Sequence, residues 1–197
     1  VKKNQTSKPM HRAVVFCNRI KESEEITKRF QSVVKAYQEY KKEDNPLTCE
    51  LRHVDGTQSA NQRGKDISWL GDATEPDECR ILSNARCLSE GVDVPALDAI
   101  FFLHHQKSHI DVVKAVGRVM RKAEGKKKGY VILPVGVPAV PKLKKALDKN
   151  KKYKVIWQVV NALCAHDRGL SRIIENARLS AGQGFEGKIA SLALVGR

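Results

Sequence analysis

The chain has 197 residues, 41% of them hydrophobic, which suffices for one ordinary domain with a buried core and an extension. This composition excludes a wholly disordered chain, and no apolar run reaches the roughly 18 residues of a membrane-spanning helix. Lys and Arg outnumber Asp and Glu by 36 to 22, which gives a net charge of +14. That charge favours a polyanionic partner, although a solvated basic surface is the alternative that charge alone leaves open.

Five cysteines stand far apart in the chain, without a CxxC pair. Their spacing argues against a disulfide framework and a structural zinc site, so we expect thiols in a reducing cytoplasm and no bound metal. The chain begins with a non-Met residue in a polar stretch that lacks the apolar core of a signal peptide. We therefore expect residues 1–9 to be an internal segment of a longer, cytoplasmic protein without membrane contact.

The first predicted strand is residues 12–17, a short apolar run rich in β-branched side chains. A long helix follows and ends before Asn45-Pro46, with one buried stripe made of Ile26, Phe30, Val33, Val34 and Tyr37. A shorter helix is predicted at residues 60–70, and another where Ile110, Val113, Val116 and Val119 recur at helical spacing. The other predicted strands are residues 51–54, 79–83, 99–103 and 130–135.

Strands alternate with helices over residues 12–135. That alternation predicts an α/β domain, in which right-handed crossovers join a parallel sheet flanked by helices. Functional residues of such sheets gather in the loops beyond the carboxyl ends of the strands. The residues just after each strand are therefore the first candidates for function.

The composition changes at residues 134–141, where prolines interrupt the pattern before a lysine-rich stretch. An apolar helical face then runs from Val155 to Cys164 and ends near Gly169, and a short helix is predicted at residues 170–179. We expect residues 1–140 to form the α/β domain and residues 141–197 to form a helical extension or linker. The apolar face of this extension is expected to pack on the sheet domain or on a neighbouring domain.

Two segments carry the most specific pattern in the chain. Residues 81–102 are ILSNARCLSEGVDVPALDAIFF, and residues 111–122 are DVVKAVGRVMRK. This pattern resembles motifs V and VI of superfamily-two helicases, because a strand is followed by an EGVDVP loop, a second strand and a helix with GRxxR. AVVFCNR resembles motif IV and HVDG resembles motif IVa, so four motifs occur in family order. The resemblance implies a RecA-like parallel sheet, the second motor domain of such a helicase.

The NARCLSEGVDVPALD and VGRVMR segments are most similar to bacterial restriction and phage-defence helicases, the type III-like and type ISP-like enzymes of the DEAD/DEAH-box group. DEAD-box RNA helicases favour ARGxD and HRxGRxGR, so the resemblance implies DNA rather than RNA as the partner. It also implies a preceding RecA-like domain in the same polypeptide. Nuclease or methyltransferase domains stay open as further neighbours.

The two arginines of GRxxR suit ATP hydrolysis. Guanidinium groups stabilise the negative charge that spreads over a γ-phosphate in the transition state, and residues i and i+3 of a helix share one face. The resemblance implies that Arg118 and Arg121 are arginine fingers and that Gly117 lets the helix approach the opposite domain. Pairing with surface carboxylates or with a nucleic-acid backbone is the alternative for both arginines.

The EGVDVP loop is expected to border the nucleotide, since the resemblance implies Gly91 near the phosphates and Asp93 near the ribose. Polar residues at three strand ends are candidates for gripping a nucleic-acid backbone without reading its bases. These residues are Asn18, Arg19, Gly56, Ser83, Asn84 and Arg86. Ordinary capping and turn chemistry is the alternative for each of them.

No GxxxxGK[ST] phosphate loop occurs in the chain. ATP and Mg²⁺ are therefore expected mainly in the preceding domain, and the chain alone is expected to hydrolyse ATP negligibly. Two positions depart from the family pattern: Lys114 replaces the Gln or His of motif VI, and Ala85 replaces the Thr of motif V. A non-catalytic RecA-like module that binds nucleic acid is the first competing hypothesis. A small-molecule transferase is the second, but CNRIKES follows the first strand where its Gly-rich loop belongs.

Overall fold

The computed structural model describes residues 10–42, 46–72, 74–85, 87, 97–104, 108–123, 126, 128–134, 154–166, 169 and 171–172. These residues form a five-stranded sheet in the order β2-β3-β1-β4-β5, with every neighbouring pair parallel. The strands are β1 (Arg12–Cys17), β2 (Thr48–Asp55), β3 (Glu78–Ala85), β4 (Ala99–Phe102) and β5 (Tyr130–Ile132). The helices are α1 (Ile20–Lys41), α2 (Ala60–Gly71), α3 (His109–Met120) and α5 (Lys154–His166).

The predicted parallel sheet is confirmed, and the observed bounds of its strands agree in part with the bounds predicted from hydropathy. β1 has its predicted bounds, since its last five residues are all buried. β2 and β3 are longer than predicted because they pair residue for residue from Thr48 with Glu78 to Asp55 with Ala85. Ladder hydrogen bonds thus retain polar strand ends that an apolar pattern leaves out. β4 and β5 end earlier than predicted, at Phe102 and Ile132.

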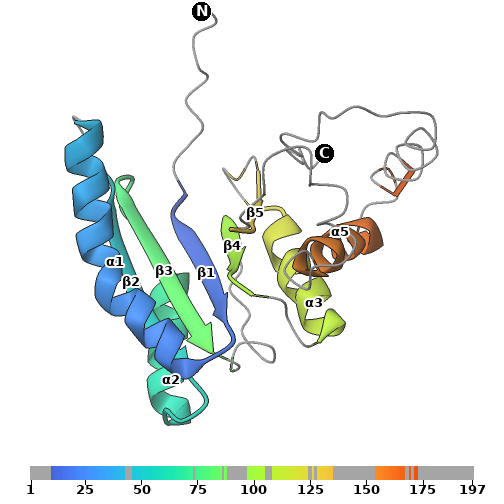
Figure 1. Ribbon diagram of the computed structural model, residues 1–197, viewed down its shortest axis with the longest axis horizontal. Coiled ribbons are helices and arrows are strands. Elements are labelled where there is room, and N and C mark those ends of the chain that lie inside the picture. The colour runs from blue at the N-terminus through green and yellow to red at the C-terminus, as the bar shows by residue number, and fades with distance from the viewer. Residues whose placement is uncertain are drawn as a thin grey trace, which may run out of the picture.

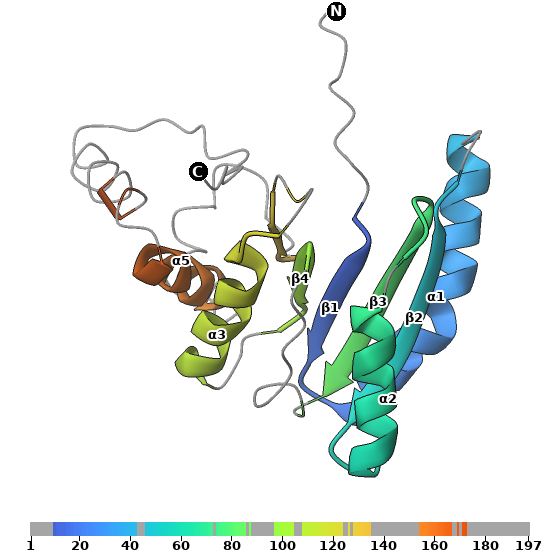
Figure 2. The ribbon, with the colours of Figure 1, turned by 180° about the vertical axis from the view of Figure 1, so that it is seen from behind.

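Alternate residues of β1 enter two separate cores, because successive side chains of a strand point to opposite faces. Val14 and Phe16 belong to the core shared with α2, α3 and α5, whereas Ala13 and Val15 belong to the core beneath α1. The ring of Phe16 stacks on that of Phe102 in β4, with centroids 5.1 Å apart. Figures 1 and 2 show α1 on one face of the sheet and α2 on the other.

α1 is longer than the sheet it covers. Its 22 residues span about 33 Å, whereas the eight residues of β2 or β3 span about 26 Å. The predicted buried stripe is therefore wrong at its far end, where Val33 and Tyr37 are 62% and 55% exposed. Ile26 and Phe30, nearer the start of the helix, pack on the core beneath α1 as predicted.

The C-terminal region contributes α5 to the domain core. Val159, Ala162 and Leu163 of α5 are buried in the same core as Val112 and Val116 of α3. The apolar face of this helix thus packs on the sheet domain, which was one of the two expectations. The domain division at residues 140 and 141 stays a prediction, because residues 135–153 lie outside the described part of the chain.

Three further features of the described residues concern disulfides, metal binding and membrane-spanning helices. All five cysteines lie among the described residues and are free thiols. Within the described ranges, no three His, Cys, Asp or Glu side chains are grouped so that they could hold a metal ion. No helix within these ranges has the length and apolar character to cross a membrane.

Candidate nucleic-acid interface and arginine-bearing helix

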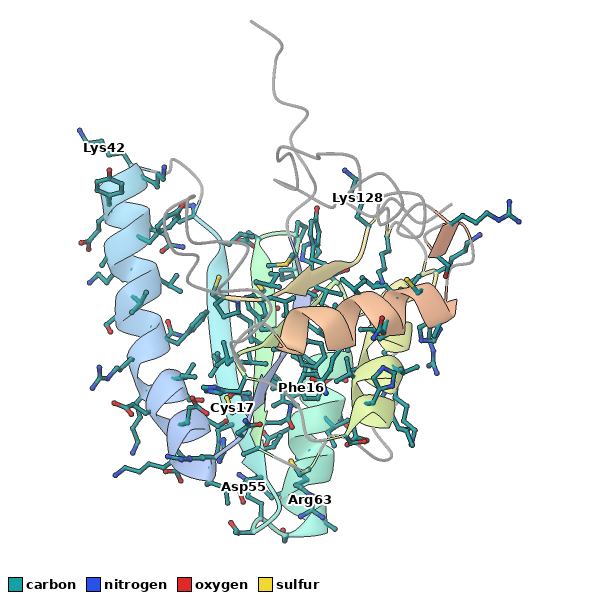
Figure 3. All side chains as sticks on the ribbon, turned by 45° about the vertical axis from the view of Figure 1, so that its right-hand side comes forward. Phe16, Cys17, Lys42, Asp55, Arg63 and Lys128 are labelled. Carbon is teal, nitrogen blue, oxygen red and sulfur yellow. The ribbon has the colours of Figure 1, made fainter. Side chains whose placement is uncertain are left out.

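Three strands of the sheet end level with one another. Cys17 at the end of β1 pairs with Ala85 of β3, which pairs with Asp55 of β2. We call this end of the three strands the carboxyl edge. Figure 3 shows Asp55 there together with Arg63 of α2. The loops that follow the three strands therefore leave from one edge, as expected for a parallel sheet.

Three of the predicted contact residues come together at the carboxyl edge. Asn18 and Arg19 follow β1 directly, and Gly56 begins the turn after β2. Arg19 and Gly56 are exposed, and Asn18 is half-buried. A Cβ atom at Gly56 would meet nothing within 4 Å, so a large partner can approach the backbone of this turn. Arg86, predicted for the same role, lies outside the described residues.

Ser83 and Asn84 differ from these loop residues because their side chains are buried. β3 continues to Ala85 rather than ending at residue 83, and β2 and β1 flank it on either side. Asn84 Nδ2 donates to the carbonyl oxygen of Val15 at 3.0 Å. Both side chains thus stabilise the sheet from within. A direct contact with phosphate requires a side chain that faces solvent, and these two are buried.

A chain of side-chain contacts links the strands beneath the exposed loops. Asp55 Oδ2 lies 2.7 Å from His53 Nε2, and His53 Nδ1 lies 2.7 Å from Ser23 Oγ. Ser23 Oγ lies 2.5 Å from Ser83 Oγ, which is 3.6 Å from the thiol of Cys17. We call Asp55, His53, Ser23 and Ser83 the edge network. Since Ser23 lies in the first turn of α1, the network ties β2 and β3 to the helix that follows β1.

The order Asp, His, Ser in the edge network is also that of the serine-hydrolase triad. Here the serine cannot act as a nucleophile, because Ser23 has 0% exposure and its hydroxyl contacts both His53 and Ser83. A substrate carbonyl therefore has no access to it. The edge network holds the carboxyl edge together rather than performing acyl transfer.

Asp55 is held as a carboxylate at the turn after β2. Thr57 donates both its hydroxyl and its backbone N–H to Asp55 Oδ1, each at 2.6 Å. The hydroxyl hydrogen bond is the main cause that lowers the pKa of Asp55, and it outweighs the opposing effect of burial. The contact with His53 lowers this pKa further. An ionised Asp55 thus fixes the turn that contains Gly56.

Sequence reasoning missed His53, Ser23 and Arg63 at this edge. Arg63 Nη1 donates to the carbonyl oxygen of Gln58 in the turn after β2. Burial raises the pKa of Cys87, in the loop after β3, to about 11, and the charge of Arg63 opposes that rise. Arg63 thus lies between the loops of two strands. The HVDG turn could have indicated Arg63, because a helix that starts after this turn has its first turn at the carboxyl edge.

α3 carries the arginines away from the carboxyl edge. Because α3 joins the parallel strands β4 and β5, it runs back across the sheet and ends at the opposite edge. Arg118 is half-buried in the last turn, and Arg121 is exposed. The prediction that both arginines lie within the helix was wrong for Arg121, which follows the last helical residue, Met120, with a ψ of 136°. Both cations still lie where the helix dipole favours positive charge.

Lys126 holds the end of α3. Its Nζ donates to the carbonyl oxygen of Val119 and, at 3.0 Å, to that of Arg121. Carbonyl groups at a helix end lack an intrahelical partner, so the ammonium group satisfies them. Burial lowers the pKa of Lys126, and the charge of Asp98 opposes this effect. Gly129 packs so closely that a Cβ atom there would lie 2.5 Å from the carbonyl oxygen of Val119.

Gly117 faces the last residue of α5. A Cβ atom at Gly117 would lie 2.9 Å from Cε1 and 3.0 Å from Nε2 of His166. His166 Nε2 donates to the carbonyl oxygen of Val113 at 3.0 Å. The close approach that this glycine permits in the structure is therefore that of α5, whereas approach of an opposite domain stays a prediction.

The other predicted positions are two residues of the EGVDVP loop and the two departures from the family pattern. Gly91 and Asp93 lie outside the described residues, so their place beside a nucleotide stays a prediction. Lys114, one of the two departures from the family pattern, is exposed on α3. Ala85, the other departure, is buried at the end of β3, where it pairs with the last residues of β1 and β2.

Comparisons with known proteins match this architecture. Residues 2–123 match the family described as "Helicase conserved C-terminal domain". The ATP-dependent type ISP restriction-modification enzyme LlaBIII, solved bound to DNA, is similar with a TM-score of 0.75 and 43% identity. That similarity covers 88% of this chain and 11% of the LlaBIII chain.

Other relatives are more distant or match a shorter segment. The C-terminal domain of the DEAD-box protein Dbp5 has a TM-score of 0.49 and 13% identity, over 84% of this chain and 82% of that domain. "Putative helicase 22" of Sulfolobus islandicus filamentous virus (isolate Iceland/Hveragerdi) is 33% identical over 61 residues, or 31% of this chain and 11% of the viral protein.

The chain spans 11% of the length of both LlaBIII and the viral protein. The family match, in contrast, spans residues 2–123 of the 197 in this chain, which is more than half. The five-stranded parallel sheet with helices on both faces agrees with that match. The chain therefore belongs to the helicase conserved C-terminal domain family, which is that of superfamily-two helicases, and it has a RecA-like fold.

Proposed function

We propose that the chain is the second motor domain of an ATP-dependent DNA helicase or translocase from a restriction or phage-defence system. The observation that carries this proposal is the 43% identity, over 88% of the chain, to an enzyme described as an ATP-dependent type ISP restriction-modification enzyme bound to DNA. The net charge of +14 supports a polyanionic partner.

The proposed contribution to ATP hydrolysis is the pair Arg118 and Arg121. Guanidinium groups suit phosphate, because each presents several N–H donors in one plane. The exposed Arg121, directly after the last helical residue, suits contact across a domain boundary, and the half-buried Arg118 lies in the last turn of the same helix. In this proposal a preceding domain holds ATP and Mg²⁺, and Gly91 and Asp93 border the nucleotide. Arginines supplied by a second domain make hydrolysis depend on domain closure.

The proposed DNA track is the carboxyl edge. Asn18, Arg19 and the backbone at Gly56 contact phosphates there, and Arg86, the next residue in sequence after β3, is proposed for the same role. Contacts to phosphates position a duplex or strand without reading its sequence, which suits a motor that moves along DNA. In this proposal the buried Ser83 and Asn84 do not contact DNA but stabilise the strands whose loops form this surface.

The test replaces the arginines in the full-length protein that carries this chain. Arg118→Ala and Arg121→Ala are each expected to lower kcat for ATP by about 1,000-fold or more, because the transition-state charge loses a guanidinium group. Binding of a non-hydrolysable ATP analogue should persist, since the main grip on ATP lies elsewhere. Arg29→Ala is the matched control, because Arg29 is exposed on α1 and pairs with Glu25.

The isolated chain provides a second arm of the same experiment. It lacks a phosphate loop, so its ATP turnover is expected to be negligible with or without DNA. Wild-type turnover by the double arginine variant of the full-length protein would show instead a non-catalytic module that binds nucleic acid. Robust, DNA-stimulated turnover by the isolated chain would show that the chain holds ATP by itself.

A further inference from the structure

α5 lies along the helix that carries the arginines. Its buried residues Val159, Ala162 and Leu163 share one core with α3, and Figures 1 and 2 both show the two helices side by side. α5 and α3 are joined only through residues 121–153 of the chain, so their contact is a tertiary one. The position of α3 is therefore set in part by a segment that follows it in sequence.

The two helices approach each other most closely at Gly117. Alanine is the better helix former, so a glycine in the middle of α3 calls for a reason in its surroundings. The imidazole of His166 supplies that reason, because a Cβ atom would lie only 2.9 Å from Cε1 of the ring. The ring also donates from Nε2 to the carbonyl oxygen of Val113 at 3.0 Å. A carbonyl oxygen has two lone pairs, so it can accept from this ring in addition to its partner within the helix.

The contact is next to the arginines. Gly117 directly precedes Arg118, and the helix ends three residues later at Met120. Lys126 also holds that end, through the carbonyl oxygens of Val119 and Arg121. Any displacement of His166 relative to Gly117 therefore acts on the last turn of α3.

We propose that His166 is a positioning residue for the arginines: seated against Gly117, it sets where α3 ends and thus where Arg118 and Arg121 lie. The inference rests on the function proposed above. It makes α5 a part of the hydrolytic apparatus rather than a linker. It also assigns Gly117 to a contact within this chain, in addition to whatever the opposite domain requires.

The test is a double-mutant cycle on ATP turnover by the full-length protein. His166→Ala should lower kcat about tenfold, with KM for ATP nearly unchanged, because the ring positions arginines but does not hold ATP. Gly117→Ala should lower kcat about 100-fold, because the new methyl group displaces the helix end. The double variant should return to the level of His166→Ala, since a Cβ atom at position 117 no longer meets the ring.

Gly64→Ala is the matched control, because Gly64 is also in the middle of a helix but a Cβ atom there would meet nothing within 4 Å. Its kcat should equal that of the unchanged protein. Thermal unfolding provides a readout independent of turnover: Gly117→Ala should lower the Tm, and adding His166→Ala should recover part of that loss. If Gly117→Ala does not fold, His166→Ala and the double variant decide the outcome.

Two results would overturn the inference. In the first, the double variant is as slow as Gly117→Ala, which assigns the glycine to another partner. In the second, His166→Ala keeps full turnover while Arg121→Ala loses it, which leaves the arginine assignment intact and removes the role of His166. Failure of the proposed function gives a different pattern, in which Arg121→Ala itself keeps full turnover.

Discussion

The carboxyl edge and the arginine-bearing end of α3 are held in place in different ways. At the carboxyl edge, buried side chains contact one another from Asp55 through to Ser83. At the end of α3, Lys126 caps backbone carbonyl groups, and His166 occupies the space that Gly117 leaves open. The first region is complete within the first three strands and the first helix of the chain. The second depends on segments that come after α3.

This difference separates a surface held by its own strands from a helix end held by later segments of the chain. Side chains that are buried and mutually hydrogen-bonded leave their partners unsatisfied if they move, so the carboxyl edge resists displacement. The end of α3 is held by the buried Val119 and also by Lys126 and His166, so its position depends in part on where those later segments lie. That contrast suits the proposed roles, in which the DNA track keeps its shape while the arginines respond to domain closure.

The largest effect is expected when the edge network loses Asp55. Asp55→Ala should lower the free energy of unfolding by about 3 kcal/mol, because His53 and both donors of Thr57 lose their acceptor. Urea denaturation of the chain measures this change. Asp77→Ala, at an exposed position before β3, should have little effect. Similar losses for the two variants would contradict the role given to the edge network.

A smaller effect is expected at the end of α3. Lys126→Met should lower the free energy of unfolding by about 1–2 kcal/mol, because the carbonyl groups of Val119 and Arg121 lose their donor. In the full-length protein it should also lower kcat for ATP while DNA affinity stays the same. Lys128→Met is the control, since Lys128 is exposed at the same end of the sheet (Figure 3). Loss of DNA affinity with unchanged kcat would reverse the assignment of the two regions.

The smallest effect is a pH dependence at the carboxyl edge. The hydroxyl of Thr57 lowers the folded-state pKa of Asp55, so the carboxylate contributes stability above its ordinary pKa, and this is lost as the pH falls through the lowered value. Thr57→Val should raise that pKa and cost about 1 kcal/mol near neutral pH. The difference from the unchanged chain should shrink on acidification and vanish where Asp55 is protonated in both folded chains.

Free energies of unfolding measured by urea from neutral to acidic pH provide this comparison. Thr27→Val is the control, because the hydroxyl of Thr27 donates to the backbone carbonyl of Ser23 rather than to a carboxylate. Its cost should not depend on pH. A constant cost for Thr57→Val over the same range would rule out Asp55 as the titrating group.

The element order and the family motifs could be predicted from the sequence, because local patterns report them directly. β1 was predicted at its observed bounds, since a short run of β-branched apolar residues suits a strand buried on both faces. The parallel sheet followed from the alternation of strands and helices, and parallel strands bring Asn18, Arg19 and Gly56 to one edge whatever their side chains do.

Other features of the site were decided by packing between distant segments. Ser83 and Asn84 are buried because β3 pairs with β2 as far as Ala85, and no pattern within β3 marks that length. α3 ends before Arg121, where Lys126 caps the last carbonyl groups, although its own sequence continues with good helix formers.

The environment of Gly117 depends on His166, which is far along the chain. A hydropathy pattern reports which face of one element is apolar, so it predicts strands and helices and their order. It contains no information on which residue of another element arrives at that face. The sequence by itself therefore determined the sheet and the motifs, and only the tertiary structure decided which side chains face solvent and what holds the arginines in place.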